Sequence, residues 1–260
     1  MNCLIIYYAE SMRSLIKTLK FIYRAIPVYV LRATAKLLAK PLDIHGRTII
    51  IAPHPDDEVL GCAGLIQRLV KEQEDVHVLI MTGGEASHTG CCNIEHNIIK
   101  SERRQLSKKA LGELGVIEQH IYFLNFTDGD ISFSDKEQVI QLRHYIKQLN
   151  PTNILVPRSD EGWKDHIETN KLITSIAHEE DKYSVYEYCV WFWFYYDWII
   201  NWKDSRLLQL NSNEHQQKIS SINTYLSPKA PCGKPWCGTL PSAMVYANRW
   251  NNEIYFNVKL

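Results

Sequence analysis

The feature that most constrains the fold of this 260-residue chain is an apolar strand that ends abruptly in a histidine and three carboxylates. Residues 48–52 are uncharged and mostly β-branched, as in a buried strand of a parallel sheet, and residues 53–58 then read Pro-His-Pro-Asp-Asp-Glu. Apolar residues with a helical spacing follow over residues 65–70. Ligands of open α/β sheets bind at the carboxyl ends of the strands, so this run predicts a site at that edge.

Strand and helix patterns alternate from residue 47 onward, which predicts right-handed βαβ units. We predict strands at 48–52, 76–82, 121–124 and 153–157, and helices near 61–72, 95–114, 136–149 and 166–179. We expect an aromatic-rich later strand at 186–198 to wall the pocket, with ordinary aromatic core as the alternative. The fold class predicted is α/β, a single domain with a Rossmann-like, mostly parallel sheet flanked by helices and an N-terminal helical extension.

Composition limits the partners of the chain. The formal net charge is zero, which argues against nucleic-acid binding by the body of the protein, but residues 1–40 carry seven cations against Glu10 alone. We therefore divide the chain into a basic amphipathic helical extension, 1–44, and one domain, 45–260. Seven cysteines without a repeating pattern favour a reducing, cytoplasmic compartment and free thiols. A structural metal at Cys232 and Cys237 would lack other paired ligands nearby.

Prolines on both sides of His54 leave the side chains of His54, Asp56 and Asp57 free to converge on one point. An imidazole and a carboxylate at that spacing can share a divalent metal ion. The alternative is a polar turn in which Asp56 or Asp57 caps the next helix. Glu58 is expected to accept helical N–H groups or to support the metal ligands.

The string around His54 resembles the signature of the PIG-L/LmbE-like family of zinc-dependent de-N-acetylases. A second motif of that family ends in Asp-His, and here residues 164–166 read Lys-Asp-His after the strand predicted at 153–157. Between the two, residues 103–115 resemble the family's helix, with Leu106 where a glutamate is usual, and Asp128-Gly129 also matches. The resemblance covers about residues 47 to 180.

The resemblance implies a zinc ion held by His54, Asp57 and His166 with an open fourth position, although two imidazoles and a carboxylate also suit iron or cobalt. Asp56 would be the general base on the attacking water and would later protonate the leaving amine. Asp165, next to His166, would be an orienting group or an N-cap.

The resemblance also gives candidate substrate contacts. Arg103 and Asp128 match positions that contact sugar hydroxyls, with surface ion pairing as the alternative. The polar, glycine-containing segment 83–97 is expected to form a loop over the site, which makes His88 a further candidate contact. Trp163 stands where the family commonly has an oxyanion-stabilising histidine, and an indole can donate a hydrogen bond but cannot carry a proton. Either Trp163 substitutes more weakly, Lys164 or His88 replaces it, or activity is low.

The function predicted is removal of acetyl from an N-acetylated amino sugar, such as a nucleotide- or lipid-linked precursor of a surface glycan. Alternatives are a deacetylase of a small N-acyl glycoside or of an antibiotic or thiol precursor, and a metal- and sugar-binding relative without turnover. Residues 12–26 predict a basic amphipathic helix that ends or kinks at Pro27, with a second short helix beyond. We expect residues 11–40 to contact the inner face of the cytoplasmic membrane, with docking on the protein's own core as the alternative.

Overall fold

The computed structural model describes residues 2–180, 182–195 and 200–260, without the side chains of residues 2–11, 13 and 14. Its strands are β1 (Lys40–Pro41), β2 (Thr48–Ala52), β3 (Val76–Thr82), β4 (Ile121–Phe126), β5 (Asn153–Pro157), β6 (Ser184–Tyr188), β7 (Ser205–Gln209) and β8 (Asn252–Asn257). Its α-helices are α1 (Asn2–Leu38), α2 (Asp57–Lys71), α3 (His96–Glu113), α4 (Lys136–Leu149), α5 (Lys164–Glu180), α6 (Ser212–Leu226) and α7 (Ser242–Asn248). Three short 3-10 turns are η1 (Glu85–His88), η2 (Glu118–His120) and η3 (Trp202–Asp204).

The strands form one eight-stranded sheet in the order β1-β7-β8-β6-β5-β2-β3-β4. Only β8 runs antiparallel to its neighbours among the described pairings. The predicted fold class, a mostly parallel α/β sheet flanked by helices in a single domain, is confirmed. The division at residue 44 stays a prediction, and β1 already pairs with β7 before that point.

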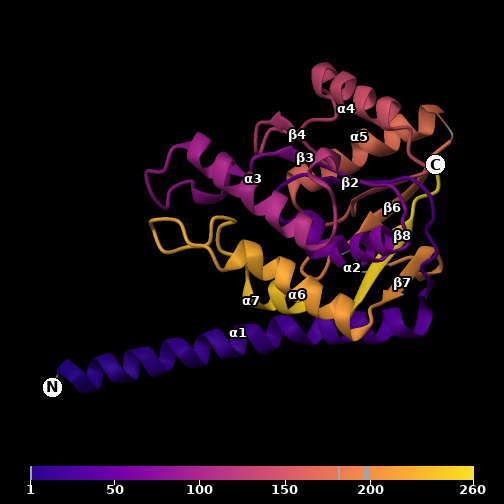
Figure 1. Ribbon diagram of the computed structural model, residues 1–260. Helices are drawn as coiled ribbons and strands as arrows, with labels where there is room; N and C mark the ends of the chain where they lie inside the picture. Colours follow the sequence, from indigo (N-terminus) through magenta and orange to yellow (C-terminus); the bar gives the residue numbers. More distant parts are fainter. Residues whose placement is uncertain (1, 181, 196–199) are drawn as a thin grey trace.

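Helices cover both faces of the sheet, because alternate residues of each central strand point to opposite sides. Ile50 and Ala52 of β2 belong to a core shared with α2, α3 and α6. Ile49 and Ile51 belong to a second core shared with α4 and α5. Figure 1 shows these two layers on either side of the sheet. Every residue of β2 is buried, as its uncharged β-branched sequence predicts.

Helix α2 packs closely against Leu210, which follows β7, and is hydrogen-bonded to Glu253 of β8. A Cβ atom at Gly64 would lie 2.3 Å from the Leu210 side chain, so only glycine allows this approach. The buried Glu253 carboxylate of β8 accepts hydrogen bonds from the backbone N–H groups of Gly64 (2.8 Å) and Leu65 (2.9 Å) and from Lys218 Nζ (2.8 Å). The N-terminus of α2 is thereby held at the carboxyl edge of β2.

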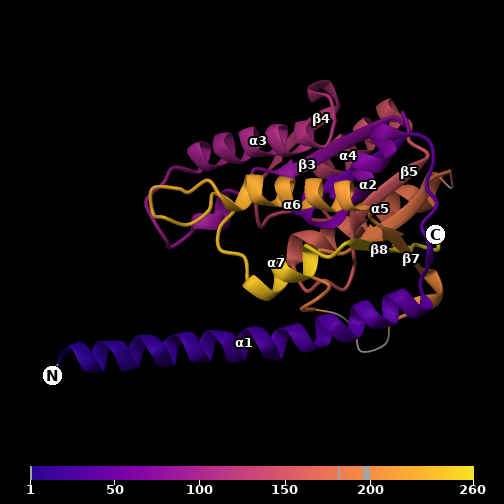
Figure 2. The same ribbon diagram turned by 60° about the horizontal axis from the view of Figure 1, so that its bottom comes forward.

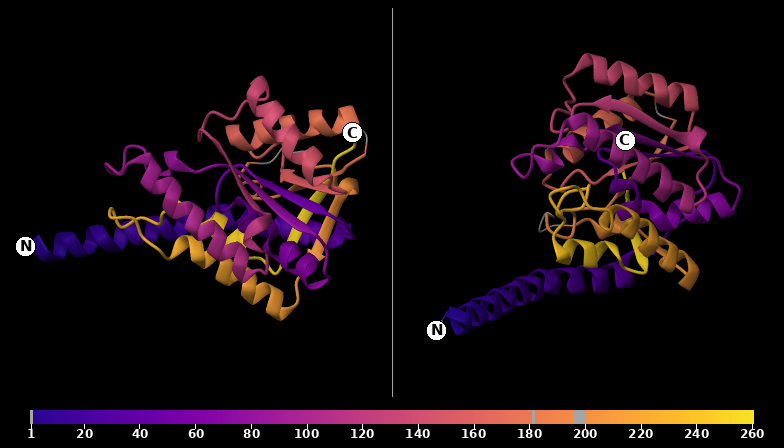
Figure 3. Two further views of the ribbon diagram at one scale, coloured as in Figure 1. Left: turned by 45° about the horizontal axis from the view of Figure 1, so that its top comes forward. Right: turned by 60° about the vertical axis from the view of Figure 1, so that its left-hand side comes forward.

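The N-terminal helix α1 continues through Pro27 to Leu38, so the predicted ending at Pro27 and the second short helix are wrong. Burial of Val28, Leu31 and Ala35 against a third core around Trp250 offsets the backbone hydrogen bond that proline removes. This part of α1 therefore docks on the protein's own core, which was the alternative to membrane contact. Figures 2 and 3 show its N-terminal part extending beyond the body of the molecule. Among the described residues, no helix is both long and apolar enough to cross a membrane.

The other predicted elements agree closely with the structure, with one exception. The strands predicted at 48–52, 76–82 and 153–157 match β2, β3 and β5 residue for residue. The aromatic-rich strand predicted at 186–198 is wrong beyond Tyr188, where β6 ends. Backbone hydrogen bonds from Phe194 and Tyr195 to Trp191 O form a turn there, and residues 196–199 lie outside the described part of the chain. An apolar aromatic run has no feature that distinguishes a strand from a buried turn.

Candidate metal and catalytic site

The candidate site lies at the carboxyl edge of the sheet, where β2 ends and α2 begins. The carbonyl oxygen of Pro53 accepts hydrogen bonds from the Thr82 amide (3.0 Å) and the Thr82 hydroxyl (2.8 Å), which ties the end of β2 to the end of β3. His54 follows this tie, and Asp57 is the first residue of α2. The strand-to-helix connection therefore delivers an imidazole and a carboxylate to the edge where ligands bind.

Asp56 has a strained backbone, with φ +123° and ψ −26°. A non-glycine residue in such a region costs about 1–3 kcal/mol and persists where its surroundings hold it. The Asp56 amide donates to Glu58 Oε2 (2.9 Å), and the buried Asp56 carboxylate lies 3.3 Å from Arg103 Nη2. The side chain makes no capping hydrogen bond with α2, so the N-cap alternative is wrong for Asp56.

Three potential metal ligands converge beside Asp56. Asp57 Oδ2 lies 3.2 Å from His54 Nδ1 and 3.2 Å from His166 Nε2, and one ligand atom from each of the three residues lies within 4.8 Å of the others. The buried His166 Nε2 atom has no hydrogen-bond partner among the described residues despite its proximity to Asp57. Two imidazoles and a carboxylate around such an orphaned atom fit a divalent metal ion with an open position.

The opposite nitrogen of each histidine meets a carboxylate. His166 Nδ1 lies 2.8 Å from Glu161 Oε2, and His54 Nε2 lies 3.2 Å from Asp128 Oδ1 and 3.3 Å from Asp165 Oδ2. Such contacts fix the tautomer and the ring orientation of metal-ligating histidines. Asp165 is thus in the position of an orienting group, as one of its two predicted roles requires.

His54, Asp128 and Asp165 form a second group whose ligand atoms could hold a metal ion. One oxygen of each carboxylate is already engaged, since Asp165 Oδ2 accepts from the Gly129 amide (2.8 Å) and Asp128 Oδ2 from the Ala86 amide (2.7 Å), while Asp165 Oδ1 is buried without a partner among the described residues. Backbone hydrogen bonds of this kind position a carboxylate to accept from an imidazole. The arrangement therefore favours the first group, His54 with Asp57 and His166, as the metal ligands.

Burial and charge tune the acids and bases of the site. Burial raises the pKa of the Asp56 carboxyl to about 8, against the opposing effect of the Arg103 guanidinium. Although burial raises the pKa of the Asp57 carboxyl, His166 and His54 hold it well below its usual range. Although burial lowers the pKa of His166, Asp57 and Glu161 raise it to about 9. Asp57 is therefore ionised, as a ligand must be, and a metal ion would displace the His166 proton.

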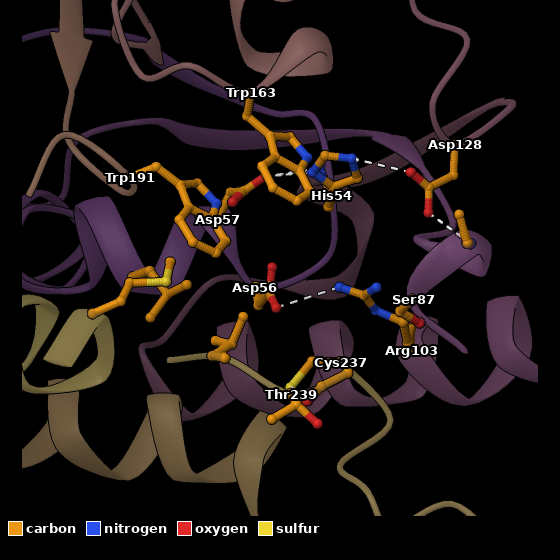
Figure 4. A pocket seen from close by; sticks show the side chains of 15 residues that line it. His54, Asp56, Asp57, Ser87, Arg103, Asp128, Trp163, Trp191, Cys237 and Thr239 are labelled. Carbon is orange, nitrogen blue, oxygen red and sulfur yellow. Dashed lines mark hydrogen bonds and ion pairs between the residues drawn. The ribbon is translucent and has the colours of Figure 1, made fainter. Parts of the chain in front are cut away.

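A pocket of about 290 Å³ opens over these groups. Figure 4 shows Asp56 and Arg103 on one side and the two indoles, Trp163 and Trp191, on the other. The indole rings stack with centroids 5.0 Å apart and planes 3° from parallel, and Trp163 is 44% exposed. The lining residues are His54, Asp56, Asp57, Leu60, Ala86, Ser87, Arg103, Asp128, Trp163, Trp191, Cys237, Gly238, Thr239, Leu240 and Met244.

Most of the residues predicted for the site meet in or beside this pocket, while their chemical roles stay predictions. Arg103 is buried and lies beside Asp56, so the surface ion-pair alternative is wrong. Asp128 lies in the pocket wall beside His54, and Trp163 lies at its mouth. His88 is buried away from the pocket wall, next to Cys92 and Cys232, which corrects its predicted contact with substrate.

The sequence analysis did not single out three parts of the site. Glu161, the partner of His166, lies in the connection between β5 and α5, where its acidic side chain five residues before His166 was the available signal. Trp191 lies in the turn after β6, within the segment 186–198 that was expected to wall the pocket, but it was not singled out. The segment Cys237 to Leu240 reaches the pocket only through the packing of α6 and α7, and nothing in its sequence marks it as part of a site.

The family of the chain follows from comparison with known proteins. Residues 49–177 match the PIG-L family model, described as GlcNAc-PI de-N-acetylase. Diacetylchitobiose deacetylase from Thermococcus kodakarensis is 27% identical over 130 residues, which make up 49% of this chain and 47% of that protein. The chain spans less than half the length of the curated relatives it matches.

Solved structures show the same fold. N,N'-diacetylchitobiose deacetylase from Pyrococcus horikoshii matches with a TM-score of 0.57 and 21% identity over 72% of each chain. The zinc inhibited form of teicoplanin deacetylase Orf2 matches with a TM-score of 0.60 and 15% identity over 81% of this chain and 97% of that one. The fold and the site define an α/β protein with a candidate metal centre at its sheet edge. The chain belongs to the PIG-L family.

Proposed function

We propose that this protein is a metal-dependent hydrolase that removes the acetyl group from an N-acetylated amino sugar. The observation that carries the proposal is the convergence of the His54, Asp57 and His166 ligand atoms next to the strained, buried Asp56 at the base of a pocket. The family model is described as a de-N-acetylase, and the relative from Thermococcus kodakarensis is described as a deacetylase. Zinc is the metal we propose, since it favours this donor set, and iron or cobalt would also fit.

The chemistry proposed divides between the metal ion and Asp56. A bound divalent ion would act as a Lewis acid toward water and the amide carbonyl. Asp56 would accept a proton as the water oxygen forms its bond to the carbonyl carbon, and would return that proton to nitrogen as the C–N bond breaks. Acetate and a free amine leave. Arg103 would hold the Asp56 carboxylate in place, and Glu161 would hold the His166 ring.

The indoles support a sugar as the substrate. Trp163 presents an exposed ring at the pocket mouth, backed by the parallel ring of Trp191. An aromatic face of this kind buries apolar surface while polar groups orient a ligand deeper in the pocket. Arg103 and Asp128 are the groups we propose to contact sugar hydroxyls. A nucleotide- or lipid-linked precursor of a surface glycan is the proposed substrate, and a small N-acyl glycoside or an antibiotic or thiol precursor is the alternative.

Acetate release tests this function. Zinc-loaded full-length protein should release acetate from at least one of free, nucleotide-linked and lipid-linked N-acetylglucosamine, and the preferred carrier identifies the substrate class. A chelator should abolish release and added zinc should restore it. Metal binding without acetate from any substrate would favour the binding protein without turnover. Retention of Asp56 in a strained backbone argues against that outcome, because a binding protein has no need of a base.

Trp163→His should raise kcat several-fold if the missing imidazole limits turnover, because an imidazolium stabilises charge that develops only in the transition state. The gain in kcat should be smaller than the contribution of a full oxyanion-hole donor, which is about 10²–10³-fold. The reason is that the indole N–H of Trp163 can already donate a hydrogen bond. Steady-state kinetics with Trp163→Phe as the matched control separate the two contributions. An unchanged or lower kcat, with a raised KM in both variants, would show that Trp163 serves as a stacking face for the sugar.

We propose further that α1 lies on the inner face of the cytoplasmic membrane. An exposed apolar stripe supports this, and its residues, each 45–73% exposed, are Met12, Leu15, Ile16, Leu19, Ile22, Tyr23, Ile26, Tyr29 and Val30. At 100° per residue the stripe lies opposite Val28 and Ala35, which dock on the body. At the same spacing the exposed Lys20 lies beyond one edge of the stripe and the exposed Lys17 lies on the opposite face, and such cations favour an anionic lipid surface. The free cysteines of the described residues agree with the cytoplasmic side.

Neutralisation of two cations tests the membrane contact. Lys17→Gln with Lys20→Gln should weaken binding to anionic vesicles by about 30-fold, since each cation contributes about 1 kcal/mol. Lys171→Gln with Lys182→Gln, on α5 and beyond it, is the matched control and should leave binding unchanged. Sedimentation should also weaken as salt rises. Full-length protein that stays in the supernatant at low salt would contradict the proposal, and a dimer in solution would then identify a second copy as the partner of the stripe.

A further inference from the structure

A second group of potential metal ligands lies away from the pocket described above. His88 ends η1, Cys91 and Cys92 lie in the loop that follows, and Cys232 lies between α6 and α7; we call these four residues the thiol cluster. Figures 1 and 2 show the two loops side by side at one end of the molecule. Ligand atoms of His88, Cys92 and Cys232 all lie within 4.8 Å of one another, and Cys91 Sγ lies 3.5 Å from Cys232 Sγ.

The orientation of His88 points to a missing ligand. Its Nδ1 atom lies 3.0 Å from Ser87 Oγ, and the Ser87 hydroxyl donates to the Trp236 carbonyl oxygen (3.4 Å). Because the Ser87 hydroxyl donates its own proton to Trp236, it can only accept a hydrogen bond from His88 Nδ1–H. The other ring nitrogen of His88, Nε2, is then unprotonated and has a free lone pair. His88 is 2% exposed, and its Nε2 atom is buried without a hydrogen-bond partner among the described residues. A buried nitrogen of this kind is costly unless something binds it.

We propose that the thiol cluster binds a structural zinc ion through His88 Nε2 and the Sγ atoms of Cys91, Cys92 and Cys232. Three cysteines and one histidine are a known closed set for structural zinc. With Zn–S distances of about 2.3 Å, tetrahedral geometry places two sulfurs about 3.8 Å apart, close to the Cys91–Cys232 separation. A disulfide would need about 2.05 Å between those sulfurs. Cys237 is not a ligand in this proposal, because its Sγ atom donates to the Tyr225 carbonyl oxygen. Cys232 would therefore bind zinc with His88, Cys91 and Cys92, and not with Cys237.

A cation lies beside the cluster. The Lys234 ammonium interacts with Cys91 and with Cys232. Zinc with three thiolates and a neutral imidazole carries one net negative charge, which Lys234 complements. The metal needs no redox partner, since each thiol releases only a proton when it binds.

This site would stabilise one wall of the pocket. Ala86 and Ser87, before His88, line the pocket, as do Gly238 and Thr239 beyond Cys232. A Cβ atom at Gly238 would lie 3.2 Å from Ser87 O, so the two segments already touch. A zinc ion between His88 and Cys232 would join them without any other covalent link. The inference does not depend on the deacetylase function, because its ligands are separate from His54, Asp57 and His166.

Cobalt substitution tests the site on the intact chain. Full-length protein loaded with Co²⁺ under reducing conditions should show thiolate-to-metal charge-transfer absorption, which a site of imidazoles and carboxylates lacks. The zinc-loaded protein should hold two ions per chain, and X-ray absorption should detect sulfur at about 2.3 Å from zinc. Absence of both signals in the wild-type protein would overturn the proposal, as would a Cys91–Cys232 disulfide that persists in reductant.

Two variants with opposite expected effects separate this site from the pocket. Cys92→Ser should lose the charge-transfer band and one zinc ion per chain, whereas His166→Ala should lose one zinc ion and keep the band. Cys237→Ser, on the same loop as Cys232, is the matched control and should keep both ions and the band. A band that survives in Cys92→Ser at full strength would contradict the assignment. Wild-type protein that holds only the thiolate-bound ion would count against the proposed function and leave the thiol site standing.

Discussion

Asp56→Asn should lower the rate of acetate release by about 10²–10⁴-fold, the usual contribution of a general acid–base group, while zinc binding and the fold are retained. Asparagine preserves the shape of aspartate and tolerates positive φ, so the strained backbone at residue 56 should survive. The amide cannot accept the proton of the attacking water. The Arg103 guanidinium would keep an oxygen acceptor at position 56.

Steady-state kinetics, zinc content and thermal unfolding are measured together on this variant. Asp130→Asn, an exposed carboxylate outside the pocket lining, is the control and should keep wild-type kcat. Wild-type rates in Asp56→Asn would assign the base to another group. Loss of zinc together with activity would indicate that Asp56 is itself a ligand, contrary to the role proposed for it.

Glu161→Gln should weaken zinc binding by about 10–100-fold, because Glu161 Oε2 meets His166 Nδ1 at 2.8 Å and orients the ring toward the metal. Titration against a competing chelator measures the change. Activity should fall at limiting zinc and recover when zinc is raised, since a positioning residue acts through its ligand. Glu161 Oε1 also accepts hydrogen bonds from the Val190 and Phe192 amides, so thermal unfolding is measured as well.

The matched control for this variant is Glu179→Gln, an exposed position on α5 that pairs with Arg143. It should leave zinc affinity unchanged. Wild-type zinc affinity in Glu161→Gln would show that Asp57 and the packing around His166 suffice to orient the ring. Activity that falls and does not recover with added zinc would assign Glu161 a role in holding the Trp191 turn instead.

The fold was largely predictable because the strands are buried on both faces. Uncharged runs such as Thr48–Ala52 have no other stable location, and β2, β3 and β5 match the prediction. The elements that the sequence did not predict depend on tertiary packing. Proline at position 27 predicts a helix end, but α1 docks on both sides of that residue through Ala25 and Val28, and the helix continues. The antiparallel β8 has no signature in its own sequence, because its direction depends on the chain that precedes it.

The candidate site was predictable where neighbours in sequence are neighbours in space. His54 and Asp57 lie three residues apart across one strand-to-helix turn, and His166 was placed by resemblance to a family motif. Trp191 was expected only as one residue of an aromatic pocket wall, and Glu161 was missed because its role depends on its contact with His166 in the folded chain. His88 was misplaced for the same reason: proximity to the site along the chain did not reveal that its ring turns toward Cys232.

Anomalous diffraction at the zinc edge, from crystals of zinc-loaded protein, tests the central claim most directly. We predict a peak about 2.0–2.2 Å from His54 Nδ1, the Asp57 carboxylate and His166 Nε2, with Asp56 adjacent but not bound. A pocket peak at the neighbouring group of His54, Asp128 and Asp165, or no pocket peak in protein that releases acetate, would contradict it.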